Sequence, residues 1–171
     1  MIQLKLYYSQ IAFSLKQNFV ISVESGKELY YSDNPGFSWK KRARVYEKAT
    51  GKFLFLINAI PFSFPRTYEI EDAFGQQIAT VKNQIHLFRT RMSILSIIGE
   101  LELKGEFASR EYTIENNGTI LCDIHKKLFS LAPIYEVDIV DEEHYLLYIA
   151  ILITLNQMIM ENNDSISTNN M

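Results

Sequence analysis

The side chains best suited to nucleophilic or metal chemistry in this sequence are its single cysteine, Cys122, and its histidines. Cys122 and His125 lie in a stretch where apolar and polar residues alternate, as they do in a half-buried strand. Positions three apart on a strand point to opposite faces, which opposes binding of one metal ion by both side chains. Cys122 instead shares a face with Ile120 and Ile124, which predicts a core position. The histidines are scattered, at His86, His125 and His144. We therefore expect neither a catalytic nor a metal-binding site.

Four acidic residues near the carboxyl end could offer oxygen atoms to calcium: Asp138, Asp141, Glu142 and Glu143. Their spacing does not match an EF-hand loop, and no glycine stands among them to make its turn. Asp141 is a good helix N-cap, and the two glutamates would lie in a first turn, where the helix dipole favours carboxylates. We therefore expect a helix start here, with no metal or other cofactor. A calcium-dependent shift in melting temperature would contradict this interpretation.

Basic residues are densest beside Trp39, at Lys40, Lys41, Arg42 and Arg44. These four residues form a candidate patch for an anionic ligand, since an anionic membrane surface attracts each basic side chain by about 1 kcal/mol. Trp39 and Phe37 could then insert at the interface between water and lipid. The alternative is a solvated face, or one that guards a strand edge. Two smaller basic pairs are Arg89 with Arg91 and Lys126 with Lys127.

Composition and motifs oppose several classes of function. The 171 residues carry 17 Lys and Arg against 20 Asp and Glu, a net charge of -3, whereas nucleic-acid-binding domains are usually basic. No glycine-rich phosphate loop, dinucleotide fingerprint or Ser-His-Asp arrangement is visible, so we expect a protein without enzymatic activity. The segment Met1–Leu6 lacks the apolar region of a secretory signal, and the single cysteine is compatible with the cytoplasm, where we expect the protein.

A repeated unit positions these residues. The pair Phe-Ser occurs at Phe13-Ser14, Phe37-Ser38, Phe62-Ser63 and Phe129-Ser130. Several pairs are followed by an alternating stretch such as Tyr112-Thr113-Ile114. A glycine then follows, at Gly26, Gly51, Gly75, Gly99 or Gly118. That order is typical of a β-hairpin whose turn is made by the glycine. The units predict about twelve strands, over residues 4–8, 19–24, 28–32, 42–47, 53–59, 67–71, 77–83, 91–97, 100–105, 111–115, 119–126 and 134–140.

The segment Tyr145–Leu155 carries no charged side chain, and with the acidic cap before it we expect a helix over 142–160. A helix that is apolar all round is buried either in protein or in a membrane. The run is shorter than the roughly 20 residues that span a bilayer, which favours burial in a protein core. A helix in lipid is the alternative.

Closing the sheet around that helix would remove its free edges. We therefore expect a mainly β fold, a closed antiparallel barrel of about twelve strands around a buried C-terminal α-helix. The barrel and helix would make one domain over residues 1–160, followed by a disordered tail over 161–171. Removing every residue from Asp141 onward should abolish the fold, because the helix supplies so much of the core.

The sequence also resembles the LURP-one-related family, over about residues 2–156. The resemblance is carried by Phe13-Ser14-Leu15, the repeated Phe-Ser pairs, the phrase Lys126–Leu131 and the ending Tyr135–Glu143 before the apolar helix. The family is similar to tubby-like and phospholipid-scramblase C-terminal domains, and the resemblance implies a twelve-stranded barrel around a central helix. It implies no established enzymatic activity, and no functional residue of the family is matched to a position here.

These features predict a cytosolic, non-enzymatic binding or scaffold module of the tubby-like kind. Its partner would be an anionic phospholipid headgroup, a small ligand or a protein, with no nucleic acid and no membrane-spanning segment expected. The alternative is a membrane-tethered, scramblase-like protein with the C-terminal helix in lipid. Solubility of the expressed protein without detergent distinguishes the two.

Overall fold

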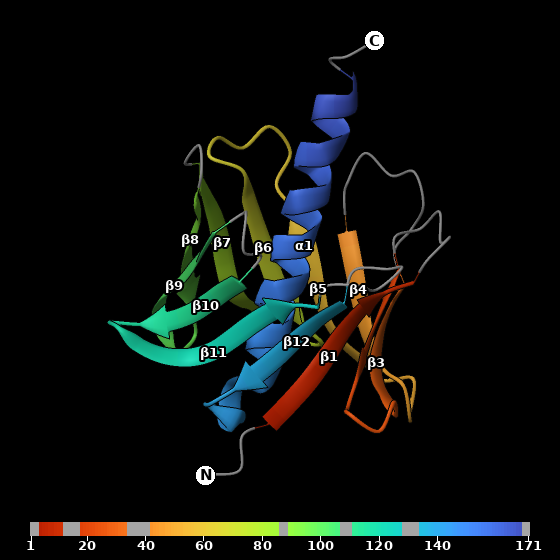
Figure 1. Ribbon diagram of the computed structural model, residues 1–171. Helices are drawn as coiled ribbons and strands as arrows, with labels where there is room; N and C mark the ends of the chain where they lie inside the picture. The colour runs from red at the N-terminus through yellow and green to blue at the C-terminus, as the bar shows by residue number, and fades with distance from the viewer. Residues whose placement is uncertain are drawn as a thin grey trace.

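Figure 1 shows the computed structural model of the chain, which describes residues 4–11, 18–33, 42–85, 89–106, 111–127 and 134–168. Within these residues, twelve strands form one closed barrel around a long helix. The mainly β fold expected from the sequence is confirmed. The elements are β1 (Leu4–Gln10), β2 (Phe19–Ser22), β3 (Glu28–Asp33), β4 (Arg42–Glu47), β5 (Phe53–Ala59), β6 (Thr67–Asp72), β7 (Gln77–Ile85), β8 (Arg89–Ser96), β9 (Gly99–Glu106), β10 (Glu111–Asn116), β11 (Thr119–Lys126), β12 (Ile134–Ile139), the 3-10 turn η1 (Glu142–His144) and α1 (Tyr145–Thr168).

The barrel is a simple antiparallel meander. Each strand pairs with its neighbours in sequence, and β1 closes the barrel by pairing with β12, where Leu4 lies opposite Ile139. The hairpin turn at Asn117-Gly118 has φ values of 48° and 83°, which glycine and asparagine adopt more readily than other residues. The other predicted turn glycines also have positive φ, so these turns are confirmed: Gly26, Gly51, Gly75 and Gly99.

Residues alternate between the inside and the outside of the barrel, as the period of a strand requires. In β12, for example, Tyr135, Val137 and Ile139 are buried, whereas Glu136 and Asp138 are only partly buried. The buried positions of all strands join in one core with the buried face of α1. This alternation explains why the strand positions could be predicted from the sequence. A shift of one residue in register would turn the apolar side chains of a strand outward.

Helix α1 fills the barrel, and its expected burial is confirmed. Every residue from Leu147 to Asn156 is buried, and the Thr154 hydroxyl donates to the Ala150 carbonyl within the helix at 2.8 Å. Burying each large apolar side chain contributes about 1.5–3 kcal/mol. By length and composition alone, Glu142–Glu161 could cross a membrane, but 61% of its apolar 18-residue stretch is buried in the barrel. The core helices of soluble proteins meet the same criteria.

Asp141 is the N-cap residue before η1, as predicted, but its carboxylate makes no side-chain cap bond and binds Tyr148 and His144 instead. The predicted bounds of the α-helix were wrong, because residues 142–144 form a 3-10 turn and α1 begins at Tyr145. The helix also continues past residue 160 to Thr168, since Glu161 is tied to the barrel wall by Arg66 and Tyr68. The predicted tail over 161–171 therefore starts within a helix, and residues 169–171 lie outside the described residues.

The two ends of the barrel differ. The glycine turns lie at the end where α1 begins, which we call the turn end. At the other end, where α1 leaves the barrel, the connection from β5 to β6 is the 60–66 loop, drawn in yellow in Figure 1. We call this the exit end. The 60–66 loop carries the Phe62-Ser63 pair, while the pairs at Phe13, Phe37 and Phe129 lie outside the described residues.

Candidate functional site

The barrel interior holds no reactive group among the described residues. The Cys122 side chain is fully buried, as the sequence predicted, and burial raises the pKa of its thiol, with a smaller effect from Asp123. The thiol is therefore protonated at neutral pH and shielded from reagents. His125 lies half-exposed on the outer wall, on the face opposite Cys122, and His86 lies outside the described residues.

At the turn end, Asp141 organises the start of the helix. Its Oδ2 atom accepts the Tyr148 hydroxyl at 2.5 Å and lies 2.9 Å from Nδ1 of His144. Burial alone would raise the pKa of Asp141, but these two hydrogen bonds lower it overall. Burial and the bond to Asp141 both raise the pKa of Tyr148. The arrangement fixes the chain entering the barrel and places no nucleophile beside an acid or base.

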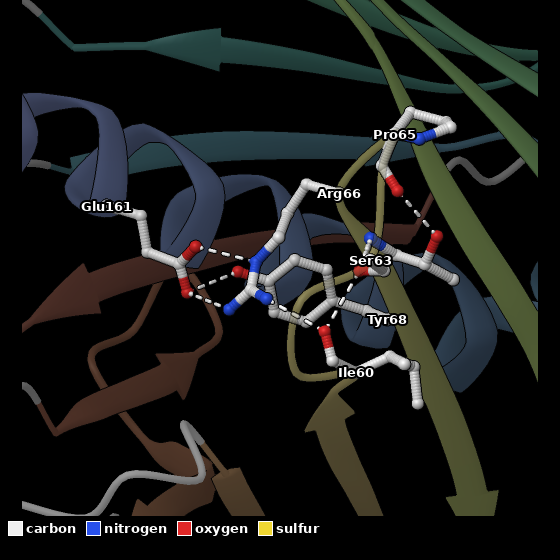
Figure 2. A network of polar contacts seen from close by, with 7 residues as sticks. Ile60, Ser63, Pro65, Arg66, Tyr68 and Glu161 are labelled. Carbon is white, nitrogen blue, oxygen red and sulfur yellow. Dashed lines mark hydrogen bonds and ion pairs between the residues drawn. The ribbon is translucent and has the colours of Figure 1, made fainter.

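At the exit end, a second polar cluster ties the helix to the wall (Figure 2). Arg66 donates from Nε to Glu161 Oε2 at 2.9 Å and from Nη2 to Glu161 Oε1 at 3.1 Å. The Tyr68 hydroxyl donates to the same Oε1 at 2.7 Å, and the guanidinium lies over the Tyr68 ring. The bond to Glu161 is the main reason that the pKa of Arg66 is raised. Burial, and then Glu161, raise the pKa of Tyr68. Because the Glu161 carboxylate accepts three hydrogen bonds, we interpret it as a structural anchor.

The same arginine shapes the 60–66 loop. Its Nη1 donates to the Ile60 carbonyl at 2.9 Å, and the Ser63 hydroxyl donates to that carbonyl at 2.9 Å. The Ser63 oxygen also accepts the backbone N–H of Thr67 at 2.9 Å, which closes the loop (Figure 2). Thr67 in turn donates from its hydroxyl to the Pro65 carbonyl at 2.9 Å.

Two phenylalanines project from this anchored loop. The side chains of Phe62 and Phe64 are 99% and 93% exposed. Phe62 has a φ of 56°, in the left-handed region that a bulky residue seldom occupies. Large apolar side chains held away from the core in this way mark candidate interaction surfaces.

The structure describes only half of the predicted basic patch. Lys40 and Lys41 lie outside the described residues. Arg42 and Arg44 lie on the outer face of β4, where Arg44 is exposed and Arg42 donates from Nε to Asn58 Oδ1 at 3.0 Å. Within the described residues neither arginine forms an ion pair with a carboxylate. The role of the patch stays a prediction.

Elsewhere on the described outer wall, several basic residues pair with carboxylates from neighbouring strands. Glu102 pairs with Arg91 and with Lys104, which also reaches Glu115. The bond from Arg91 is the largest influence on Glu102 and lowers the pKa of that carboxyl. Three strands further round the barrel, Glu136 of β12 pairs with Lys5 and Lys127. Of the smaller basic pairs of the sequence, Arg91 and Lys127 therefore take part in these ion-pair networks, while Lys126 lies over the Tyr135 ring.

The four acidic residues near the carboxyl end do not form a common cluster. Asp138 lies on the outer wall, 3.4 Å from the Lys5 ammonium, while Asp141 binds His144 and Tyr148. Glu142 and Glu143 are exposed in the first turn, as predicted. Among the described residues, no three His, Cys, Asp or Glu side chains are grouped so that they could hold a metal ion.

The sequence analysis missed the exit-end cluster. Arg66 and Glu161 are 95 residues apart, and no local pattern links them. The signal it could have used is the composition of Phe62-Ser63-Phe64-Pro65-Arg66, where two aromatics stand in a segment that must be a loop because proline ends the strand pattern. The repeat drew attention to Phe62 as a marker and away from its exposure.

The comparisons with known proteins agree with this architecture. A family model described as LURP-one-related matches residues 4–156. The barrel is similar to the X-ray structure of a protein from Arabidopsis thaliana, with a TM-score of 0.58 and 14% sequence identity over 89% of this chain and 91% of that chain. At this identity the likeness shows the fold alone. No protein with curated annotation matches the sequence significantly.

Proposed function

This chain belongs to the LURP-one-related family and has its tubby-like barrel, and from that premise we propose that it is a non-enzymatic module that binds an anionic phospholipid surface from the cytoplasm. The proposal assigns binding to the outside of the barrel at its exit end. We place binding on the outside because α1 and the inward-facing side chains fill the barrel interior, the space in which other barrels hold a ligand.

The reactive groups of the described residues support a role without catalysis. The thiol is buried and protonated, and the two polar clusters at the barrel ends hold the helix with their hydrogen bonds. A catalytic site usually brings titratable groups together in a cleft, with pKa values shifted for proton transfer. Here the groups whose pKa values are shifted are buried in the core, hydrogen-bonded at the barrel ends or held in surface ion pairs.

One observation carries the choice of an anionic surface. Arg42 and Arg44 lie on one wall of the barrel and form no ion pair within the described residues, whereas Arg91, Lys104 and Lys127 are paired with glutamates. In the sequence, Lys40 and Lys41 directly precede these arginines. Basic side chains that form no ion pair attract an anionic membrane over a distance of about 10 Å at moderate ionic strength, and Arg42 and Arg44 meet that condition within the described residues.

Flotation with lipid vesicles tests the proposal. The full chain should float with vesicles that contain phosphatidylserine, float less with neutral phosphatidylcholine vesicles, and detach as salt is raised. The variant with Lys40→Ser, Lys41→Ser, Arg42→Ser and Arg44→Ser should lose most of this binding. A control variant with Lys27→Ser, Lys48→Ser and Lys52→Ser, all exposed at the turn end, should bind like the unchanged chain.

Equal flotation of the two serine variants would remove the basic patch from the proposal. No flotation of the unchanged chain with either kind of vesicle would overturn phospholipid binding itself. A helix embedded in lipid, the second candidate, is favoured only by the length and apolar composition of Glu142–Glu161. It would require α1 to leave the barrel, and the protein would then need detergent to stay in solution.

A further inference from the structure

We propose that the 60–66 loop is a membrane-insertion loop, which places Phe62 and Phe64 in the interfacial layer of an anionic bilayer. This inference rests on the proposed function and adds to it an apolar contact, the residues that make it and the orientation of the barrel. The exit end would face the membrane, with the turn end pointing away.

The exposure of the two rings is the first observation. A phenylalanine at 99% exposure and another at 93% on the same short loop make almost no contact with the rest of the chain. Exposed single apolar residues are common, but adjacent large ones that gather at a projecting loop mark a site of interaction. A protein partner would have to supply a pocket for each projecting ring, whereas a bilayer interface accepts a projecting ring without one.

The anchoring of the loop is the second observation. Ser63 and Arg66 bind the Ile60 carbonyl, and Arg66 is held in turn by Glu161 of the helix. Phe62 occupies a left-handed backbone conformation at a φ of 56°, which is unfavourable for a bulky side chain. The chain thus holds the rings outward at an energetic cost. A loop fixed in its binding shape loses little conformational entropy when it inserts.

Charge on the adjoining strands is the third observation and favours a lipid surface. Arg42 lies opposite Asn58, close to where β5 enters the loop. Exposed Lys82 lies opposite Thr67, where β6 leaves it. Two carboxylates lie near these basic residues. Glu69 lies opposite Asn58, in the same cross-strand row as Arg42, and Glu161 is paired with Arg66. Basic side chains on either side of apolar ones are the usual combination in segments that bind anionic membranes.

The turn end supplies a matched control. Phe74 is 95% exposed on the tight turn between β6 and β7, at the opposite end of β6 from the loop. Its neighbours are acidic, since Asp72 Oδ1 accepts the N–H groups of Phe74 and Gln76 at 2.9 Å, and Glu71 precedes it. An anionic surface would repel this turn. Phe74→Ser therefore removes an equally exposed ring without touching the proposed contact.

The experiment compares binding of the full chain, Phe62→Ser with Phe64→Ser, and Phe74→Ser to phosphatidylserine-containing and phosphatidylcholine vesicles. The double loop variant should lower the partition coefficient by about a hundredfold, which is about tenfold for each aromatic ring that no longer inserts. Phe74→Ser should leave the coefficient unchanged. All three proteins should melt alike, because the substituted rings are exposed.

A second readout reports insertion itself. In a chain with Trp39→Phe, the variant Phe64→Trp carries its single tryptophan in the loop. Its emission should shift to the blue on vesicle binding and be quenched by brominated lipid tails, while Phe74→Trp in the same background should show neither effect.

The outcomes separate this inference from the proposed function. Vesicle binding that is unaffected by the loop serines, or a loop tryptophan that stays in water on bound protein, would overturn insertion and leave headgroup binding intact. Loop-dependent binding that is equal on neutral and anionic vesicles would support insertion and overturn the anionic preference. No binding of the unchanged chain to either vesicle would overturn both. Binding of the loop in the pocket of a partner protein, without any vesicle binding, would also overturn insertion.

Discussion

Glu161→Ala is the perturbation that examines the helix anchor most closely. The substitution removes the acceptor of two Arg66 bonds and of the Tyr68 hydroxyl, while Arg66 keeps its bond to the Ile60 carbonyl. The side chains of Arg66 and Glu161 are 29% and 16% exposed, so the pair is neither a surface pair nor a fully buried one.

The expected loss lies between two limits. Exposed pairs contribute about 0–1 kcal/mol, and breaking a buried pair costs about 3–5 kcal/mol. A two-bond pair at this exposure is worth about 1.5 kcal/mol, and the orphaned Tyr68 hydroxyl adds about 1 kcal/mol. Glu161→Ala should therefore lower the free energy of unfolding by about 2.5 kcal/mol, which for a chain of this size lowers Tm by about 5–10 °C.

Urea denaturation followed by circular dichroism measures this loss, with thermal melting as a second measure. Tyr68→Phe alone should cost about 1 kcal/mol. A double-mutant cycle with Arg66→Met should give a coupling energy of about 1–2 kcal/mol between Arg66 and Glu161. The control is Glu142→Ala at the exposed start of the helix, which should change stability by less than about 0.5 kcal/mol. If Glu161→Ala matched the control, or if the two exit-end changes were additive, the helix would not be anchored there.

Three further predictions follow from other parts of the fold. A chain that ends at Val140 lacks α1 and should show no cooperative melt by calorimetry, whereas a cooperative melt of this soluble fragment would show that the barrel does not need its helix. Asp141 has a pKa below its ordinary value of 3.8, so its contribution to stability is present at neutral pH and is lost as pH falls through its folded pKa. Asp141→Asn should therefore be less stable than the unchanged chain at pH 7 but approach it in acid, and an equal stability difference at all pH values would contradict this. A Cβ atom at Gly105 would lie 2.2 Å from Tyr112 Cδ1 and 2.7 Å from the Glu111 carbonyl oxygen, so Gly105→Ala should cost about 1–3 kcal/mol or more in urea titration, while an unchanged midpoint would show that β9 and β10 can move apart.

The strands could be predicted because their signal is local. Alternation such as Tyr135-Glu136-Val137 fixes which face of a strand is buried, and glycines such as Gly118 mark where it must turn. The helix was recognisable from an apolar run that no half-exposed helix would carry. These features also predict that the sheet closes into a barrel, because closure around a buried apolar helix leaves no strand edge unpaired.

The features that sequence reasoning missed depend on distant partners or on shape. We expected the helix to end at residue 160 because asparagines usually favour caps and turns. It continues for eight more residues, about two turns, and the first of them, Glu161, is bonded to Arg66. Asp141 has a side chain suited to an N-cap, but its carboxylate accepts a hydrogen bond from Tyr148 instead of capping the helix. The role of Gly105 could not be predicted, because a glycine inside a strand indicates a close neighbour without identifying it. In the structure that neighbour is Tyr112.

Binding on the outer surfaces follows only if the helix occupies the barrel. Native-state amide hydrogen exchange measures this residue by residue. The amides of residues 147–156 should exchange only through global unfolding, with the same free energy as those of Tyr68 and Ile70 in β6, both without vesicles and on phosphatidylserine-containing ones. Exchange of these helix amides at a lower opening free energy than β6, while the strands stay protected, would show that the helix leaves the barrel and would contradict the account.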